Sequence, residues 1–200
     1  MPFVYSSGSR ALQDRYDSRR LADRLAEVKV HDRFTDDDRT FIESRDMFFL
    51  ASVDALGQPT CSYKGGDPGF VTVLDGRRLA FPCYDGNGMF LTAGNIADQG
   101  AVGLLFIDFE AQRRIRVDGL ARLEPEHPLL ERHPAAQFMV VVKAGSIYPN
   151  CSRYIHRYQL VERSRFVPRA ETPTPVPDWK RSAWAADALP ERDPAREPDT

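Results

Sequence analysis

The sequence predicts a mainly β protein, an antiparallel β-barrel of six or more strands with a few peripheral helices. Short segments of strand length, either apolar throughout or alternating, recur through the middle of the chain. Two of their connections, residues 54–58 and Asp75-Gly76, contain turn-forming residues that favour hairpins. Few segments have helical spacing, and closing the sheet into a barrel would remove exposed strand edges.

The amino-terminal residues 1–30 are predicted to form an amphipathic helical arm. Apolar residues recur at helical spacing across residues 11–30, at Leu12, Tyr16, Leu21, Leu25 and Val28. This thin apolar stripe is expected to lie on the main domain or on a partner subunit. A second helix is predicted over residues 36–45, because Thr35 is an N-cap residue and three aspartates follow it in the first turn. Capping explains these aspartates without a metal site.

The strands are predicted from residue 47 onward. Residues 47–53 and 59–64 form one hairpin, and residues 70–74 and 78–83 form a second one around Asp75-Gly76. A helix over residues 88–98 leads to residues 101–109, an apolar run typical of a strand buried on both faces. The remaining strands are an alternating one at 113–123, a β-branched run at 138–142 and a last region at 154–166, with a turn or short helix at 125–133.

Residues 168–200 differ in composition from the barrel region at 31–167. They contain seven of the fifteen prolines, many charges and few large apolar residues. Such a segment buries too little apolar surface to fold alone, so an extended or disordered tail is expected.

Composition also excludes several classes of partner. A net charge of -2 gives no bulk positive field for non-specific nucleic-acid binding. No stretch approaches the roughly 20 apolar residues of a membrane span, and the start of the chain lacks a signal-peptide pattern. The three cysteines have no CxxC spacing, which fits reduced thiols better than a disulfide framework or zinc site. A cytoplasmic protein with no bound metal is expected.

Two glycine-rich bends, residues 62–70 and 81–89, each adjoin an apolar strand and are predicted to form two walls of one pocket. Ser62 and Lys64 share a strand face, and Asn87 with Gly88 would open a helix whose amides could bind a phosphate. Arg114 and Arg116 also share one strand face. Singly, each of these residues is as well explained by a solvated strand or a turn.

In this order, the segments 59–64, 81–87 and Arg-Ile-Arg-Val-Asp-Gly at 114–119, with the helix before 102–106, resemble the pyridoxamine 5'-phosphate oxidase-like family of FMN-binding split β-barrels. The resemblance covers residues 31–166. It implies a homodimer with FMN at the subunit interface, in which Arg114 contacts the cofactor from the second subunit and Arg116 lies beside it. It further implies that the cofactor is lined by Thr60, Cys61, Ser62, Tyr63, Lys64, Phe81, Pro82, Asn87 and Met89.

The sequence departs from the family pattern in three places. Residues 124–136 contain no good counterpart of the helix that supplies further phosphate ligands in the true oxidases. Many relatives have arginine or Ser-Arg-Lys after Gly-Asn, where this chain has Asn87-Gly88-Met89-Phe90. Arg153 and His156 loosely resemble the Arg-x-His segment that holds the substrate phosphate in the true oxidases, with different spacing. The small-molecule substrate is therefore expected not to be pyridoxamine phosphate. His156 is the candidate for proton transfer by its side-chain chemistry, with a structural histidine as the alternative.

The resemblance implies an FMN-dependent oxidoreductase acting on an unidentified small molecule. Two alternatives remain open at the level of sequence. One is a split barrel that uses F420 or haem, and the other is a non-catalytic protein that binds or sequesters flavin.

Overall fold

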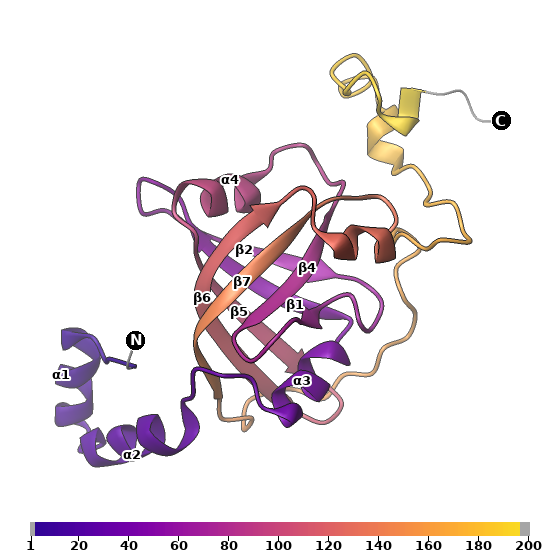
Figure 1. Cartoon of the computed structure of the whole chain (residues 1–200). Coiled ribbons are helices and arrows are strands. Elements are labelled where there is room, and N and C mark those ends of the chain that lie inside the picture. The colour runs from indigo at the N-terminus through magenta and orange to yellow at the C-terminus, as the bar shows by residue number, and fades with distance from the viewer. Residues whose placement is uncertain (1–2, 197–200) are drawn as a thin grey trace. The chain divides into compact units, whose positions relative to one another are not determined.

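The computed structural model describes residues 3–196 (Figure 1). The first two residues of the predicted arm and the last four of the predicted tail lie outside the described residues. The chain forms two compact units, one up to Val161 and one from Glu162 onward. The division into arm, barrel domain and tail stays a prediction.

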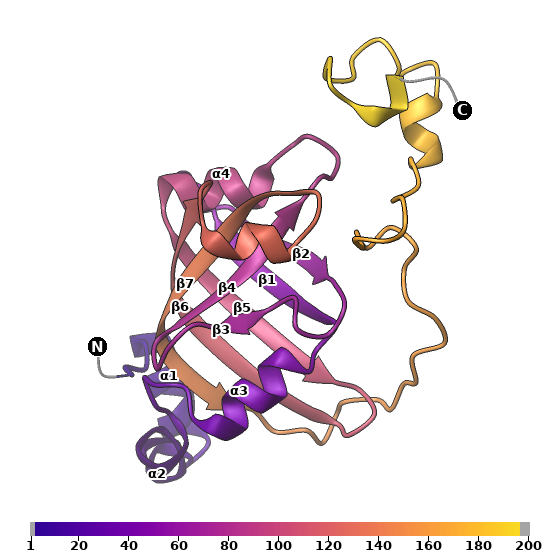
Figure 2. The same cartoon turned by 45° about the vertical axis from the view of Figure 1, so that its right-hand side comes forward.

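The first unit contains a seven-stranded antiparallel sheet that curls into a split β-barrel (Figures 1 and 2). The prediction of a mainly β, antiparallel fold is confirmed, as are both hairpins. The strand order is β2-β1-β5-β6-β7-β4-β3. The strands are β1 Met47–Val53, β2 Pro59–Gly65, β3 Thr72–Val73, β4 Arg78–Tyr84, β5 Ala101–Asp108, β6 Arg113–Glu124 and β7 Ala136–Pro149.

The core lies inside the curled sheet, where alternate residues of each strand are buried. The ring of Phe48 lies at its centre, with centroids 5.0 Å from both Phe81 and Phe106. In β5 only every second residue is buried, such as Leu104, while Leu105 is half-buried on the outer face. The prediction that β5 is buried on both faces is therefore wrong. Its outer-face residues keep part of their surface exposed within the described chain.

Helices α3 (Asp36–Glu43) and α4 (Leu91–Asp98) lie at opposite ends of the barrel (Figures 1 and 2). The first begins with the predicted cap, in which the side chains of Thr35 and Asp38 bond each other's backbone amides. It also covers the sheet edge at β3, because the Glu43 Oε1 atom accepts a hydrogen bond of 2.9 Å from the Val73 amide. Helix α3 thus protects an edge that the split barrel leaves open.

Three predicted elements differ in the structure. Residues 154–166 contain no strand, because the chain leaves the sheet at Pro149 at the end of a β7 that is much longer than the predicted run. The helix predicted from Gly88 begins only at Leu91, after a residue with left-handed backbone, Phe90 at φ 50°. The segment after β6 forms a short 3-10 helix, η1 (Pro128–Arg132), as the prolines indicated.

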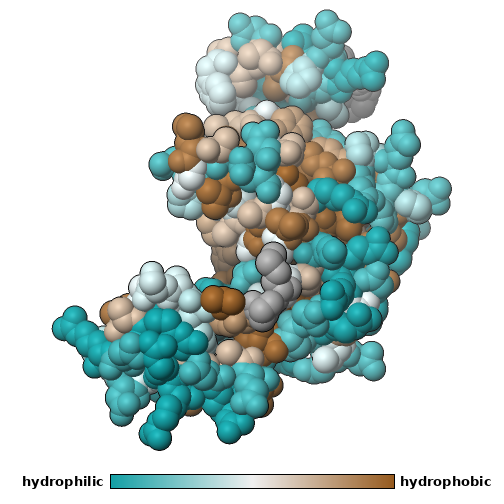
Figure 3. Space-filling model, turned by 60° about the vertical axis from the view of Figure 1, so that its left-hand side comes forward, coloured by the Kyte–Doolittle hydropathy of each residue, from teal (hydrophilic) through white to brown (hydrophobic). Residues whose placement is uncertain are grey.

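The predicted arm forms two helices rather than one, α1 (Ser7–Arg15) and α2 (Arg19–Lys29). They separate at Asp17, whose φ of 49° interrupts a right-handed helix. Neither helix contains a buried residue, and Figure 3 shows the arm as mostly hydrophilic whereas apolar surface gathers on the barrel. The arm joins β7 where the backbone of His31 exchanges two hydrogen bonds, of 3.0 and 2.8 Å, with Ile147.

The second unit contains two short 3-10 helices, η2 (Asp178–Arg181) and η3 (Pro194–Arg196). A buried ion pair of 2.6 Å joins Lys180 to Asp193 within this unit, and the rings of Trp179 and Trp184 stack at 5.9 Å. Among residues 3–196, no helix has the length and apolar character that a bilayer crossing requires.

Candidate functional site

The two glycine-rich bends lie together in the structure, on either side of a cleft at the α4 end of the barrel. The cleft consists of two adjoining cavities of about 250 and 190 Å³. Strand β2 forms one wall, and β4 with the start of α4 forms the other. The inner cavity is largely apolar, and the outer one is bounded by the loop before α4. Residues lining both are Lys64, Cys83, Tyr84, Gly86, Thr92 and Ala93.

Period-two alternation along β2 decides which side chains face the cleft. Ser62 and Lys64 point into it, and the Ser62 hydroxyl lies 3.0 Å from the Thr92 hydroxyl at the start of α4. Tyr63 lies on the opposite face of β2, but its ring reaches the inner cavity at its edge. The hydroxyl pair fixes the first turn of α4 against β2 and sets the width of the cleft.

Two aromatic rings leave no room for a side chain at either glycine of the bend after Lys64. A Cβ atom at Gly65 would lie 2.7 Å from the Tyr63 ring, and one at Gly66 would lie 2.4 Å from Phe70. Real Cβ atoms do not approach other atoms this closely, so each glycine leaves room for one ring. The bend therefore positions Tyr63 and Phe70 at the inner end of the cleft, where both line the cavity.

Lys64 is the only cationic residue lining either cavity, and all of the lining residues are within the described chain. No hydrogen bond or ion pair of the described chain engages its ammonium group. Burial lowers the pKa of Lys64, against an opposing effect of the Cys83 sulfur. Burial likewise raises the pKa of the Cys83 thiol. A partly desolvated ammonium without a partner is a group that an anionic ligand would stabilise.

A buried polar cluster that the sequence analysis missed supports this wall. The Asn95 Nδ2 atom donates to the hydroxyls of Ser52 and Thr60 at 3.0 and 3.2 Å, and those hydroxyls lie 3.0 Å apart. The cluster joins α4 to β1 and β2 beneath the cleft. Asn95 could have been found as the one amide in an otherwise apolar helix face. Thr60, predicted to line the cofactor, lies in this cluster and not among the lining residues.

The loop before α4 lines the outer cavity through Asn87 and Met89, as predicted. The Asn87 side chain accepts a hydrogen bond of 3.1 Å from the Met89 amide, so it shapes the turn. Because α4 begins at Leu91, its first-turn residues Leu91 and Thr92, rather than Asn87 and Gly88, present a helix N-terminus to the outer cavity. This corrects the predicted position of the helix amides while keeping them at the same cleft.

The other predicted residues lie elsewhere in the chain. Phe81 and Pro82 line the inner cavity, but Arg114 and Arg116 on β6 line neither cavity. Arg116 shares a cluster with Tyr148 and Asp118, in which the tyrosine hydroxyl donates to Asp118 at 2.9 Å. Arg114 differs, since its Nε atom is buried without a hydrogen-bond partner in the described chain.

Three further predicted residues are exposed and outside the cleft of the same chain: Cys61, Arg153 and His156. The Arg153 guanidinium donates to the Cys151 sulfur at 3.1 Å. The His156 ring lies 6.5 Å from the ring of Tyr158, and no acidic or basic side chain of residues 3–196 hydrogen-bonds to it.

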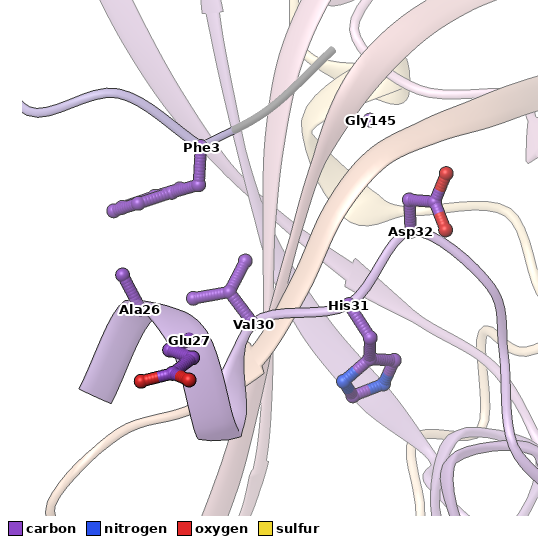
Figure 4. Close-up of a pocket in the computed structure, with 7 residues that line it drawn as sticks. All are labelled: Phe3, Ala26, Glu27, Val30, His31, Asp32 and Gly145. Atoms are coloured by element: carbon purple, nitrogen blue, oxygen red, sulfur yellow. The ribbon is translucent and has the colours of Figure 1, made fainter. Parts of the chain in front are cut away.

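A larger hollow of about 570 Å³ lies between α2 and β7 and contains none of the predicted site residues (Figure 4). Phe3, Ala26 and Val30 face one another there. His31, at its rim, is already bonded to Asp38 at 2.8 Å. Within residues 3–196 no group of three or more histidine, cysteine or acidic side chains is arranged to hold a metal ion.

A family model described as pyridoxamine 5'-phosphate oxidase matches residues 34–164, which include every strand and the whole cleft. The chain belongs to the pyridoxamine 5'-phosphate oxidase family. The resemblance inferred from the ordered segments is thereby confirmed. A search of curated proteins gave no match.

Solved structures with a similar fold include HupZ from Group A Streptococcus, at 19% identity and a TM-score of 0.49, covering 63% of this chain and 99% of HupZ. An FMN-binding protein from Syntrophomonas wolfei matches at 14% identity and 0.45, covering 71% and 97%. HutZ, the haem storage protein of Vibrio cholerae, matches at 21% and 0.41, covering 56% and 92%. No function is carried over from them at this level of similarity.

Proposed function

We propose that the protein binds FMN in the cleft between β2 and α4 and acts as a flavin-dependent oxidoreductase on a small molecule other than pyridoxamine phosphate. Lys64 carries this proposal: a half-buried ammonium without a partner, in a cleft that is otherwise free of cations. The nearby N-terminus of α4 adds amide donors of the same electrostatic sign. Together they suit a phosphate group.

The rest of the cleft suits a planar ring system. Phe70, Phe81, Pro82 and Ile96 make the inner cavity apolar, and Ser62 with Thr92 supplies hydroxyls in the adjoining outer cavity. Most ligand sites combine such an apolar slot with a few placed polar groups. When bound, the flavin would supply hydride and electron transfer, while these side chains would hold the ring and exclude water. No side chain of the cleft need transfer a proton.

A homodimer with the flavin between subunits is part of the proposal. Arg114 supports it, because its buried Nε atom has no hydrogen-bond partner in the described chain and it lies outside that chain's own cleft. A second subunit that brings Arg114 to the cofactor would provide the cation that the loop Asn87-Gly88-Met89 lacks. Arg116, held by Tyr148 and Asp118, is less available for this role.

The visible spectrum of the purified protein, before and after addition of FMN, tests the proposal. We expect a flavin spectrum that weakens in Lys64→Ala and in Arg114→Ala and is unchanged in Lys143→Ala, an exposed lysine on β7. A protein that takes up no FMN would overturn the proposal. A Soret band would identify haem instead, and an F420 spectrum would identify the deazaflavin.

Oxidation of NADH or NADPH with common acceptors separates an enzyme from a flavin-sequestering protein. We expect the FMN-loaded protein to be reduced and reoxidised over many cycles. Bound FMN that stays oxidised with either donor would favour the sequestering alternative.

A further inference from the structure

The segment after β7 closes a second cavity, on the other side of Tyr63 from the cofactor cleft. We call residues 155–160 the strap. It is fixed to the turn between β5 and β6, because Gln112 donates a 2.6 Å hydrogen bond to the Ile155 carbonyl and the Tyr158 amide donates one of 3.3 Å to Phe109. The ring of Tyr158 lies 5.3 Å from that of Phe109. This is the segment for which the sequence predicted a last strand.

The cavity under the strap, here named the strap cavity, has a volume of about 430 Å³. That volume lies within the range of about 300–1,000 Å³ that small-molecule sites occupy. Three aromatic rings line it, those of Tyr63, Phe109 and Tyr158. Tyr63 also lines the inner cavity of the cofactor cleft, so the two sites adjoin at this one residue.

Arg45, the single cationic residue among the described residues that line the strap cavity, is already paired with an acidic side chain. Arg45 forms an ion pair of 2.6 Å with Asp108, its Nε atom donates to the Phe41 carbonyl at 3.3 Å, and both members of the pair are mostly buried. Asp108 in turn accepts from the backbone amides of Glu110 and Ala111. This pair forms a neutral part of the cavity wall.

Two carboxylates remain, those of Asp46 and Glu110. Neither has a hydrogen bond or an ion pair to its side chain in the described part of the molecule. Asp46 lies close enough to Tyr63 that its charge, after burial, helps to raise the pKa of the tyrosine hydroxyl. The strap cavity therefore combines aromatic rings with a net negative charge, whereas the cofactor cleft contains an unpaired cation.

We propose that the strap cavity binds a small aromatic cation, such as an arylalkylammonium or arylamidinium ion. Aromatic rings attract cations through their faces, and carboxylates form the stronger, charge-assisted hydrogen bonds with them. An anion would meet Asp46 and Glu110 as like charges. This inference does not depend on the proposed function, because it follows from the rings and carboxylates of the strap cavity itself, which Tyr63 separates from the cleft.

Three probes of the same shape and different charge test it: benzamidinium, benzamide and benzoate, titrated calorimetrically into the full-length protein with and without FMN. We expect benzamidinium to bind about tenfold tighter than benzamide, since a hydrogen bond to a charged group contributes about 1.5–3 kcal/mol. Benzoate should not bind. Equal affinities for benzamidinium and benzamide would overturn the proposal.

Two variants, each with a matched control, test whether the probes bind in the strap cavity. Asp46→Asn should lower the affinity for benzamidinium about fivefold or more and leave that for benzamide unchanged, while Asp98→Asn, an exposed carboxylate at the end of α4, should change neither. Tyr158→Ala should weaken both probes, and Tyr154→Ala, which is 86% exposed and outside the cavity, should weaken neither. Unchanged probe binding in both Asp46→Asn and Tyr158→Ala would overturn the proposal.

The FMN titration separates this proposal from the proposed function. FMN uptake without selective benzamidinium binding would overturn the strap cavity alone. Benzamidinium binding that depends on Asp46 in a protein that takes up no FMN would support the strap cavity and overturn the proposed function alone.

Discussion

The cofactor cleft and the strap cavity lie on opposite faces of the same strand and have opposite charge. Lys64 faces the cleft and has no partner among residues 3–196, whereas Tyr63, the residue before it, borders a cavity lined by Asp46 and Glu110, whose carboxylates no described side chain engages. The alternation of β2 thus places an unpaired cation and two carboxylates on opposite faces of one strand. Under the two proposals, this strand would serve two ligands of opposite charge.

The two sites also differ in how they are held. The cleft rests on a buried cluster of Asn95, Ser52 and Thr60, which fixes α4 to β1 and β2. The strap is held mainly by two hydrogen bonds and one ring contact, and Tyr158 remains 58% exposed. Ordered buried networks rigidify a site, while exposed segments open at low cost in free energy. We therefore expect the cleft to be preformed and the strap to move when ligand enters.

Gly65→Ala is expected to have the largest effect on the boundary between the two sites. The added Cβ atom would lie 2.7 Å from the Tyr63 ring, which must leave its position. Because charge-assisted and aromatic contacts contribute about 1–3 kcal/mol, benzamidinium affinity should fall about tenfold and FMN affinity about threefold, measured by calorimetry. Gly94→Ala, where the Cβ atom meets nothing within 4 Å, is the control. Unchanged affinity for both ligands would show that Tyr63 does not form the boundary.

The pH dependence of FMN binding distinguishes the charge of the cleft from its shape. Burial lowers the pKa of Lys64 from the ordinary 10.5, so the unliganded protein loses this proton at a lower pH than a free lysine does. Phosphate binding needs the protonated form. FMN affinity should therefore be highest below the lowered pKa and fall severalfold as the pH rises through it, at a pH below the 10.5 of a free lysine. Lys64→Arg, whose charge does not titrate in this range, should flatten the profile, and a profile identical to that of the native protein would exclude Lys64 as its cause.

Thr60→Val should have the smallest effect on FMN affinity, and it tests whether the buried cluster stabilises the fold or contacts the cofactor. It removes the hydroxyl that accepts from Asn95 at 3.2 Å while keeping the side-chain shape. We expect a loss of about 1 kcal/mol in the free energy of unfolding and a change of less than about threefold in FMN affinity, measured by urea unfolding and calorimetry. A large loss of FMN affinity with unchanged stability would instead make Thr60 a direct cofactor contact, as the family resemblance implied.

The sequence was sufficient for the elements whose signals are local. The hairpin turns, the N-cap at Thr35 and the alternation of Arg113–Glu124 depend on neighbouring residues, and all occur in the structure. The two walls of the cleft were also predicted, because both bends carry glycine and polar residues beside strands. Their order along the chain indicated the family that the match over residues 34–164 confirms.

The predictions from sequence were wrong or incomplete where contacts between distant parts of the chain determine the structure. The predicted last strand has a plausible residue pattern, but β7 pairs with β6 as far as Pro149 and the chain then leaves the sheet to form the strap. Asn95 and Ser52 are 43 residues apart, and no sequence pattern shows that they meet. Likewise, the charge of the strap cavity depends on Arg45 pairing with Asp108, which removes the one cation that composition alone would assign to it.

The central claim is that Lys64 binds the phosphate of FMN, and comparison of FMN with riboflavin tests it most directly. Both share the flavin ring, and only FMN carries the phosphate. The native protein should bind FMN about tenfold or more tightly than riboflavin, Lys64→Arg should retain this preference, and Lys64→Ala should lose most of it, in line with the strength of charge-assisted hydrogen bonds. A preference for FMN that persists undiminished in Lys64→Ala would contradict the account.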